Sequence, residues 1–366
     1  IIVGAGSAGC TLANRLTEDV SRTVLLLEAG GKDSNPWIHI PVGFVKTLDM
    51  PGLNWRFETE PEPNSKNRRI PIPRGRVLGG SSSINGMVYV RGQPLDYDTW
   101  SQLGNRGWSY ESVLPYFSKS ENYESSDEAW RGKNGELVTA EGREKAELLD
   151  VVLDAAEQCG YPKNADYNSG DQEGFGYFQV TQKNGRRWST AKAFLEPALK
   201  RPNLNLEIND HTAGILTDGG RATGVKFEQN GKTRTVTAAK GVVLCAGAVQ
   251  SPQILELSGI GNPNILRQYG IEVVHSLPGV GENYQDHYMV RQTWEIKKKI
   301  TLNEQTRGIS LIREALRYAF TRRGIMTYPA GILAGFVRTR PEVATVSYTH
   351  LRAHETGRNL VCRLLL

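Results

Sequence analysis

Long apolar runs are missing from this sequence: no stretch of about 18 consecutive apolar residues occurs, so no membrane-spanning helix is predicted. Cysteine is scarce, with four residues and no Cys-x-x-Cys pair, which excludes a disulfide scaffold and a cysteine zinc site. An excess of charge of one sign is also lacking, since the sequence has 44 basic and 39 acidic residues. No run of alternating aromatic and basic residues indicates nucleic-acid binding. These features predict a cytoplasmic protein, with peripheral attachment at an inner membrane as the alternative.

Glycine, in contrast, is abundant and clustered, with 39 residues among 366. The chain opens with the apolar strand-like residues 1–3, and Gly4, Gly6 and Gly9 then match the pattern G-x-G-x-x-G. In a dinucleotide fold these glycines allow a tight turn, close approach of a pyrophosphate, and helix–strand packing. Apolar residues follow at four-residue spacing, so a helix is predicted whose first N–H groups, at Ser7 and Ala8, face the phosphates.

An acidic residue stands where a ribose-binding carboxylate is expected. The strand-like run 23–27 ends before Glu28 and Ala29, and Glu28 follows Gly9 by 19 residues. A carboxylate there suits two ribose hydroxyls and repels a 2′-phosphate, which argues against NADP. This motif does not separate FAD from NAD, and a glycine turn without any ligand is the remaining alternative.

A second glycine-rich run, residues 79–83, reads Gly-Gly-Ser-Ser-Ser. Its N–H groups and hydroxyls predict an anion cradle at a helix start, which includes Gly80. Two cradles far apart in the sequence imply a long, two-ended ligand. On residue chemistry alone, a serine-rich capped turn explains the run equally well.

Longer stretches carry a family resemblance. Residues 75–98 (GRVLGGSSSINGMVYVRGQPLDYD) and 247–261 (GAVQSPQILELSGIG) resemble the two signatures of the glucose–methanol–choline (GMC) flavoprotein oxidoreductases. Linking stretches agree, including Arg-Trp-Ser-Thr-Ala at 187–191 and Pro-Gly-Val-Gly-Glu-Asn at 278–283. The resemblance extends from residue 1 to about residue 345.

This resemblance implies an α/β protein (α+β overall), with a Rossmann-like FAD-binding domain and an incomplete second, sheet-containing substrate domain. The implied division is 1–125 and 186–287 for FAD binding, 126–185 for a substrate or lid segment, and 288–345 for the start of the substrate domain. FAD is expected to be non-covalent, because no histidine lies within residues 75–98. The residues expected to bind it are Gly4, Gly6, Ser7, Ala8, Gly9, Glu28, Ala29, Val77, Gly80, Asn85, Gly86, Met87, Val88, Ala213 and Gly247.

The implied reaction is oxidation of a primary alcohol, choline-like or aliphatic or aromatic, to the aldehyde by hydride transfer to the flavin. The electron acceptor stays open between a quinone, another carrier and O₂. An inactive nucleotide-binding module and an NAD-dependent Rossmann dehydrogenase are the alternatives. No metal site and no nucleic-acid partner are expected.

No catalytic residue is assigned. The family's base is a histidine near the C-terminus, and residues 288–345 contain no histidine. His287 is interpreted as a structural residue, and His39, His211 and His275 as surface or otherwise satisfied histidines. We therefore expect a C-terminally truncated enzyme that is inactive by itself.

The end of the chain differs in character. Residues 346–366 resemble a tail found on unrelated reading frames, and we expect this segment to be non-native. Its His350 and His354 stand four apart, as on one helix face, so a metal pair is the alternative, although no third ligand is evident.

Overall fold

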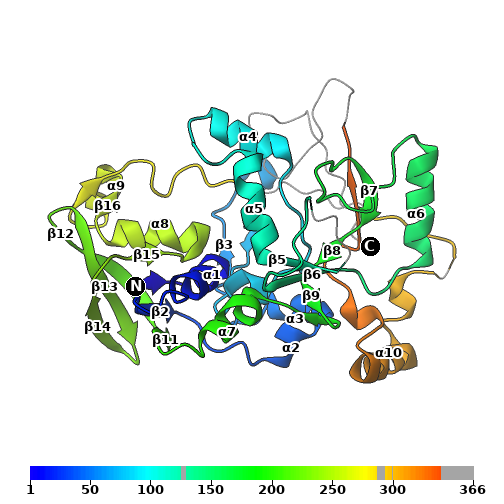
Figure 1. Ribbon diagram of the computed structural model, residues 1–366, viewed down its shortest axis with the longest axis horizontal. Coiled ribbons are helices and arrows are strands. Elements are labelled where there is room, and N and C mark those ends of the chain that lie inside the picture. Colours follow the sequence, from blue (N-terminus) through cyan, green and yellow to red (C-terminus); the bar gives the residue numbers. More distant parts are fainter. Residues whose placement is uncertain (125–128, 287–292, 299, 339–366) are drawn as a thin grey trace. The chain divides into compact units, whose positions relative to one another are not determined.

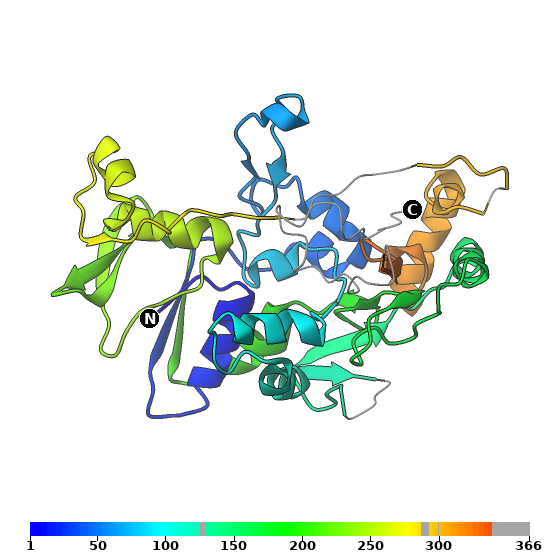
Figure 2. The same cartoon turned by 90° about the horizontal axis from the view of Figure 1, so that it is seen from above.

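The computed structural model describes residues 1–124, 129–286, 293–298 and 300–338, and the predictions for His287 and for the tail at 346–366 lie outside the described residues. The chain divides into two compact units, each described by itself (Figures 1 and 2). The first comprises Ile1–Ile38, Val45–Asn85 and Ser189–Tyr284, and the second His39–Phe44, Gly86–Trp188 and Gln285–Leu366. Residues 86–125, which the sequence analysis placed with the FAD-binding domain, therefore cluster with the second unit.

A parallel sheet organises the first unit. Its strand order is β11-β2-β1-β15, formed by Leu204–Ile208, Val24–Glu28, Ile2–Val3 and Val243–Leu244. Helix α1 (Ser7–Leu16) connects β1 to β2, which is the crossover that parallel neighbours require. The predicted α/β class is confirmed, and β15 brings the chain back to this sheet beside β1.

Each face of this sheet is covered by different elements. On one face α1 packs against a helical segment, Ala191–Leu195 continuing into α7 (Glu196–Ala198), and Asn14 donates to the Phe194 carbonyl at 2.7 Å. On the other face Val3 and Leu27 pack against Val225, Phe227 and Ile254. These last residues belong to the antiparallel sheet β12-β13-β14 and to helix α8 (Figure 1). Alternate residues of β1 and β2 thus enter separate apolar layers.

The antiparallel sheet consists of β12 (His211–Asp218), β13 (Arg221–Gln229) and β14 (Lys232–Thr237). Its turns fall at Gly219-Gly220 and Asn230-Gly231, all with positive φ, as the Gly and Asn-Gly pattern predicts. The preceding strand, β11, joins the parallel sheet instead of this one. Strand β12 was not predicted as a separate element.

Most of the remaining elements of the first unit are short. Its other strands are β3 (Phe57–Glu58), β4 (Pro71–Ile72), β16 (Ile260–Gly261) and β17 (His275–Ser276), and its other helices are α9 (Pro263–Gln268) and the longer α8 (Gly247–Leu257). The single-turn helices α2 (Pro36–His39) and α3 (Phe44–Thr47) lie where the chain passes from one unit to the other. Helix α8 begins at Gly247, which adopts φ 84° and turns the chain directly out of the β15 region.

In its described residues, the second unit combines small sheets with four longer helices. Its helices are α4 (Pro94–Gln102), α5 (Tyr110–Ser120), α6 (Glu147–Gln158) and α10 (Gly308–Thr321). Its strands are β5 (Glu121–Tyr123), β6 (Leu137–Glu141), β7 (Gly174–Tyr177), β8 (Gln179–Val180), β9 (Gln182–Lys183), β10 (Arg186–Arg187) and β18 (Leu333–Phe336). Tyr167, Phe178, Ala334 and Phe336 form its apolar core. Within the described residues, no helix is long and apolar enough to cross a membrane.

Candidate functional site: a nucleotide cavity in the first unit

A cavity of about 640 Å³ lies in the first unit, where β1, β2 and β15 end and α1 and α8 begin. Eight of the fifteen predicted FAD-binding residues line it: Gly4, Gly6, Ser7, Ala8, Glu28, Ala29, Gly80 and Gly247. Ligands of open parallel sheets bind outside the carboxyl ends of the strands, so this is the position that the fold favours.

The glycines at the start of α1 have separate packing reasons. A Cβ on Gly9 would lie 1.8 Å from the Gly4 carbonyl oxygen, so helix and turn pack too closely for any side chain. Gly4 has φ 97°, and a Cβ there would lie 2.6 Å from the Cys245 carbonyl oxygen. A Cβ on Gly6 would meet only the Gly80 Cα, at 3.9 Å. The protein's own packing therefore does not require a glycine at position 6, and Gly6 lines the cavity.

The N-terminus of α1 suits an anion. Its N-cap is Gly6, which has no side chain to accept the first N–H groups, and the first turn holds no acidic residue. Unpaired N–H groups and the helix dipole favour negative charge at such an end. Because Gly6, Ser7 and Ala8 all line the cavity, a diphosphate fits there.

Glu28, at the end of β2, is 6% exposed and lines the same cavity. Its Oε2 accepts from the Ala5 N–H and its Oε1 from the Gly30 N–H, both at 2.8 Å. Burial raises the pKa of this carboxyl, while the two N–H groups and the charge of Arg76 oppose the rise. A carboxylate has about four acceptor positions, so each oxygen retains capacity for a ligand hydroxyl.

The Gly79–Ser83 run lies against the first glycine turn instead of forming a distant second cradle. The Gly79 N–H donates to the Ala5 carbonyl at 2.8 Å, and a Cβ on Gly80 would lie 2.7 Å from the Gly6 Cα. The Ser82 and Ser83 hydroxyls donate to the carbonyls of Gly79 and Leu78 at 2.6 and 2.7 Å. The hydroxyls thus shape the turn itself, as in the capped-turn alternative, while Gly80 and Ser81 line the shared cavity.

The wall is completed by residues that the sequence did not assign to the site, among them His211, which is exposed as expected but lines the cavity. Trp55, Phe57 and Arg74 come from the excursion between β2 and Gly79, and His211 and Thr212 from β12. The Trp55 ring lies 5.8 Å from Phe57 in a stacked pair and 5.7 Å from the exposed ring of His211. An aromatic shelf of this kind suits a planar base. Lone aromatic residues in a loop carry no periodic signal, so only the folded chain reveals them.

Several predicted residues do not line this cavity. Val77 is fully buried in a core cluster with Ile38, Leu53 and Ile84. Ala213 follows Thr212 at a register shift of β12, one residue beyond the lining. Asn85 ends the first unit, whereas Gly86, Met87 and Val88 belong to the second.

Comparison with known proteins agrees with this geometry. Residues 1–289 match a family model described as GMC oxidoreductase. An oxygen-dependent choline dehydrogenase of Sinorhizobium medicae is 47% identical over 287 residues, which are 78% of this chain and 52% of that protein. Its counterpart in Brucella melitensis is 42% identical over 354 residues, 97% of this chain and 64% of the relative. The chain thus spans between half and two thirds of the length of these curated relatives.

Solved structures show the same similarity. A pyridoxine 4-oxidase from Mesorbium loti superposes with a TM-score of 0.76 at 32% identity, covering 78% of this chain and 56% of that one. An FAD-dependent oxidoreductase from Chaetomium thermophilum superposes with a TM-score of 0.84 at 30% identity, covering 92% and 61%.

Proposed function

Because the chain belongs to the GMC oxidoreductase family, whose members use FAD, we propose that its first unit binds the adenosine diphosphate half of FAD without a covalent bond. The observation that carries this proposal is the cavity that joins the uncapped N-terminus of α1, the Glu28 carboxylate and the aromatic shelf of Trp55 and His211. These are an anion site, a hydroxyl acceptor and a base-stacking surface, which are the three needs of that ligand.

The proposed reaction is oxidation of a primary alcohol to the aldehyde, and the curated relatives favour a choline-like alcohol. FAD, when bound, supplies the hydride acceptor. In this chain, Gly6, Ser7 and Ala8 would hold the diphosphate, and Glu28 would accept from the ribose hydroxyls. Met87 and Val88 are proposed to face the flavin through their backbone. None of the described histidines is assigned as the base that takes the hydroxyl proton.

Titration of the purified protein with FAD and, separately, with NAD tests the cofactor proposal. We expect FAD to be retained through gel filtration, with the visible absorption of bound flavin, and NAD to be lost. A colourless protein that retains NAD would refute the FAD assignment.

Reduction of the FAD-loaded protein by choline, followed by reoxidation with an artificial acceptor or with O₂, tests the reaction and its acceptor. We expect this chain to reduce its flavin about 10²–10⁴-fold more slowly than a full-length relative, the usual effect of a missing general base. Comparable rates would show that the described part contains the base.

A further inference from the structure

The segment 86–91 in the second unit has an unusual backbone. Met87 is fully buried and has φ 62°, a left-handed conformation that residues other than glycine rarely adopt. A Cβ on Gly86 would lie 2.2 Å from the Ala330 Cβ, so this residue also has no room for a side chain. Such a backbone persists only where its surroundings hold it firmly, and strained positions concentrate at functional sites.

The pairing of this segment with β8 gives Val88 a defined orientation. The Thr181 N–H donates to the Met87 carbonyl at 2.9 Å, and the Tyr89 N–H donates to the Gln179 carbonyl at 2.8 Å. These two bonds flank the pair formed by Val88 and Val180, which is therefore a non-hydrogen-bonded antiparallel pair. The N–H and C=O of Val88 consequently point away from β8.

Tyr167 connects the segment to β8 from the side. Its hydroxyl donates to the Tyr89 carbonyl at 3.0 Å and accepts from the Gln179 N–H at 2.6 Å. Its neighbour Asn168 accepts from the Arg91 N–H at 2.7 Å. Tyr167 and Asn168 are each 3% exposed, so these bonds form without competition from water.

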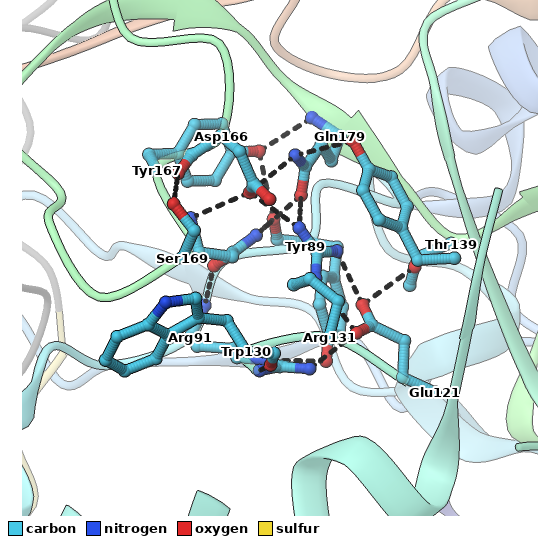
Figure 3. Close-up of polar contacts among 12 residues, drawn as sticks. Tyr89, Arg91, Glu121, Trp130, Arg131, Thr139, Asp166, Tyr167, Ser169 and Gln179 are labelled. Atoms are coloured by element: carbon cyan, nitrogen blue, oxygen red, sulfur yellow. Dashed lines mark hydrogen bonds and ion pairs between the residues drawn. The ribbon is translucent and has the colours of Figure 1, made fainter. Parts of the chain in front are cut away.

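A buried group of charges lies beside these residues, and Asn168 donates to its Gln179 side chain at 2.8 Å (Figure 3); we call Arg91, Glu121, Arg131, Asp166 and Gln179 the Glu121 cluster. Glu121 accepts from Arg131 at 2.6 and 2.9 Å and from Arg91 at 2.5 Å. Arg131 also donates to Gln179 at 2.9 Å and to Asp166 at 2.6 Å. Two arginines and two acids cancel in charge, so the cluster supplies rigidity rather than a net field.

We propose that Tyr167, supported by the Glu121 cluster, is a positioning residue for the flavin. This inference rests on the proposed function, in which the Met87–Val88 backbone faces the flavin. Backbone dipoles stabilise charge that develops on a bound group only when they are held in place beforehand. Through two hydrogen bonds, Tyr167 ties the Tyr89 carbonyl to the Gln179 N–H, and so holds the segment that carries Val88 in register against β8.

A matched pair of variants tests this role in the FAD-loaded protein. Tyr167→Phe removes the bridging hydroxyl, whereas Tyr318→Phe removes another buried hydroxyl of the same unit, which donates to the Gly185 carbonyl at 3.0 Å and does not contact residues 86–91. The measurement is equilibration of the flavin with a dye of known potential. In Tyr167→Phe we expect the ratio of reduced to oxidised flavin to fall about threefold to tenfold, the effect of one net hydrogen bond. Tyr318→Phe is expected to leave the ratio unchanged.

Thr139→Val provides a second test if Tyr167→Phe does not fold. The Thr139 hydroxyl donates to Glu121 at 2.8 Å, so its loss loosens the cluster, and a smaller shift of the ratio in the same direction is expected. An unchanged ratio in the folded variants, or an equal shift in Tyr318→Phe, would overturn the positioning role. A wild-type protein that binds no FAD would instead refute the proposed function.

Discussion

Replacement of Gly6 by Ala separates a ligand-binding role from a folding role more cleanly than any other change in the cavity. Gly6 has φ −78°, which alanine adopts without strain, and the added Cβ would meet only the Gly80 Cα, at 3.9 Å. The free energy of unfolding of the apoprotein should therefore stay within about 0.5 kcal/mol, or rise slightly because the unfolded chain loses freedom. The same methyl group would occupy the position that a diphosphate needs.

The expected loss in FAD affinity follows from the contacts that the methyl group displaces. One charge-assisted hydrogen bond between an N–H group and a phosphate contributes about 1.5–3 kcal/mol, so the dissociation constant should rise by about tenfold to one hundredfold. Flavin-fluorescence titration measures this constant, and urea unfolding measures stability. Gly52→Ala is the matched control, because a Cβ there meets nothing within 4 Å and Gly52 does not line the cavity. Tight FAD binding by a stable Gly6→Ala protein would show that no phosphate approaches this turn.

Four further substitutions test other parts of the structure. Glu28→Gln leaves either the Ala5 N–H or the Gly30 N–H facing an amide nitrogen instead of a carboxylate oxygen. We expect the free energy of FAD binding to weaken by about 1.5–3 kcal/mol and the free energy of unfolding of the apoprotein to fall by about 1–3 kcal/mol. Unchanged FAD retention would show that Glu28 is not at the ribose site. Glu121→Gln should cost about 3–5 kcal/mol in urea unfolding at neutral pH, because it leaves Arg91 and Arg131 without their shared buried carboxylate. Burial alone would raise the pKa of Glu121, but the two arginines outweigh it and lower the pKa below 4.5, so this stabilisation should be lost as the pH falls below 4.5, and the variant should show a weaker acid dependence. Burial raises the pKa of the Cys10 thiol to about 12, whereas Cys159 is exposed. In thiol labelling at pH 8, Cys159→Ser should therefore remove one fast-reacting thiol and Cys10→Ser none. Fast labelling of Cys10 would contradict its burial.

The sequence alone was enough to predict the local structure of this protein at its glycine turns and hairpins. The spacing of Gly4, Gly6 and Gly9 between an apolar run and an amphipathic run predicts strand, turn and helix, because the positive φ of Gly4 and the close approach of Gly9 to Gly4 are demands that act within a few residues. The Asn230-Gly231 turn was predictable for the same reason, since a two-residue hairpin requires positive φ at both positions.

Tertiary structure alone decided which distant segments meet. The run 79–83 predicted a separate cradle, yet Gly80 packs against Gly6 and both line one cavity. Trp55 and His211 line the cavity from segments more than 150 residues apart, and neither belongs to a local sequence pattern that predicts a binding residue. The Glu121 cluster likewise gathers its members from 91 to 179, where opposite charges pair because burial leaves them no water. Local sterics can be derived from neighbouring residues, whereas such meetings depend on how the whole chain buries its apolar surface and satisfies its buried polar groups.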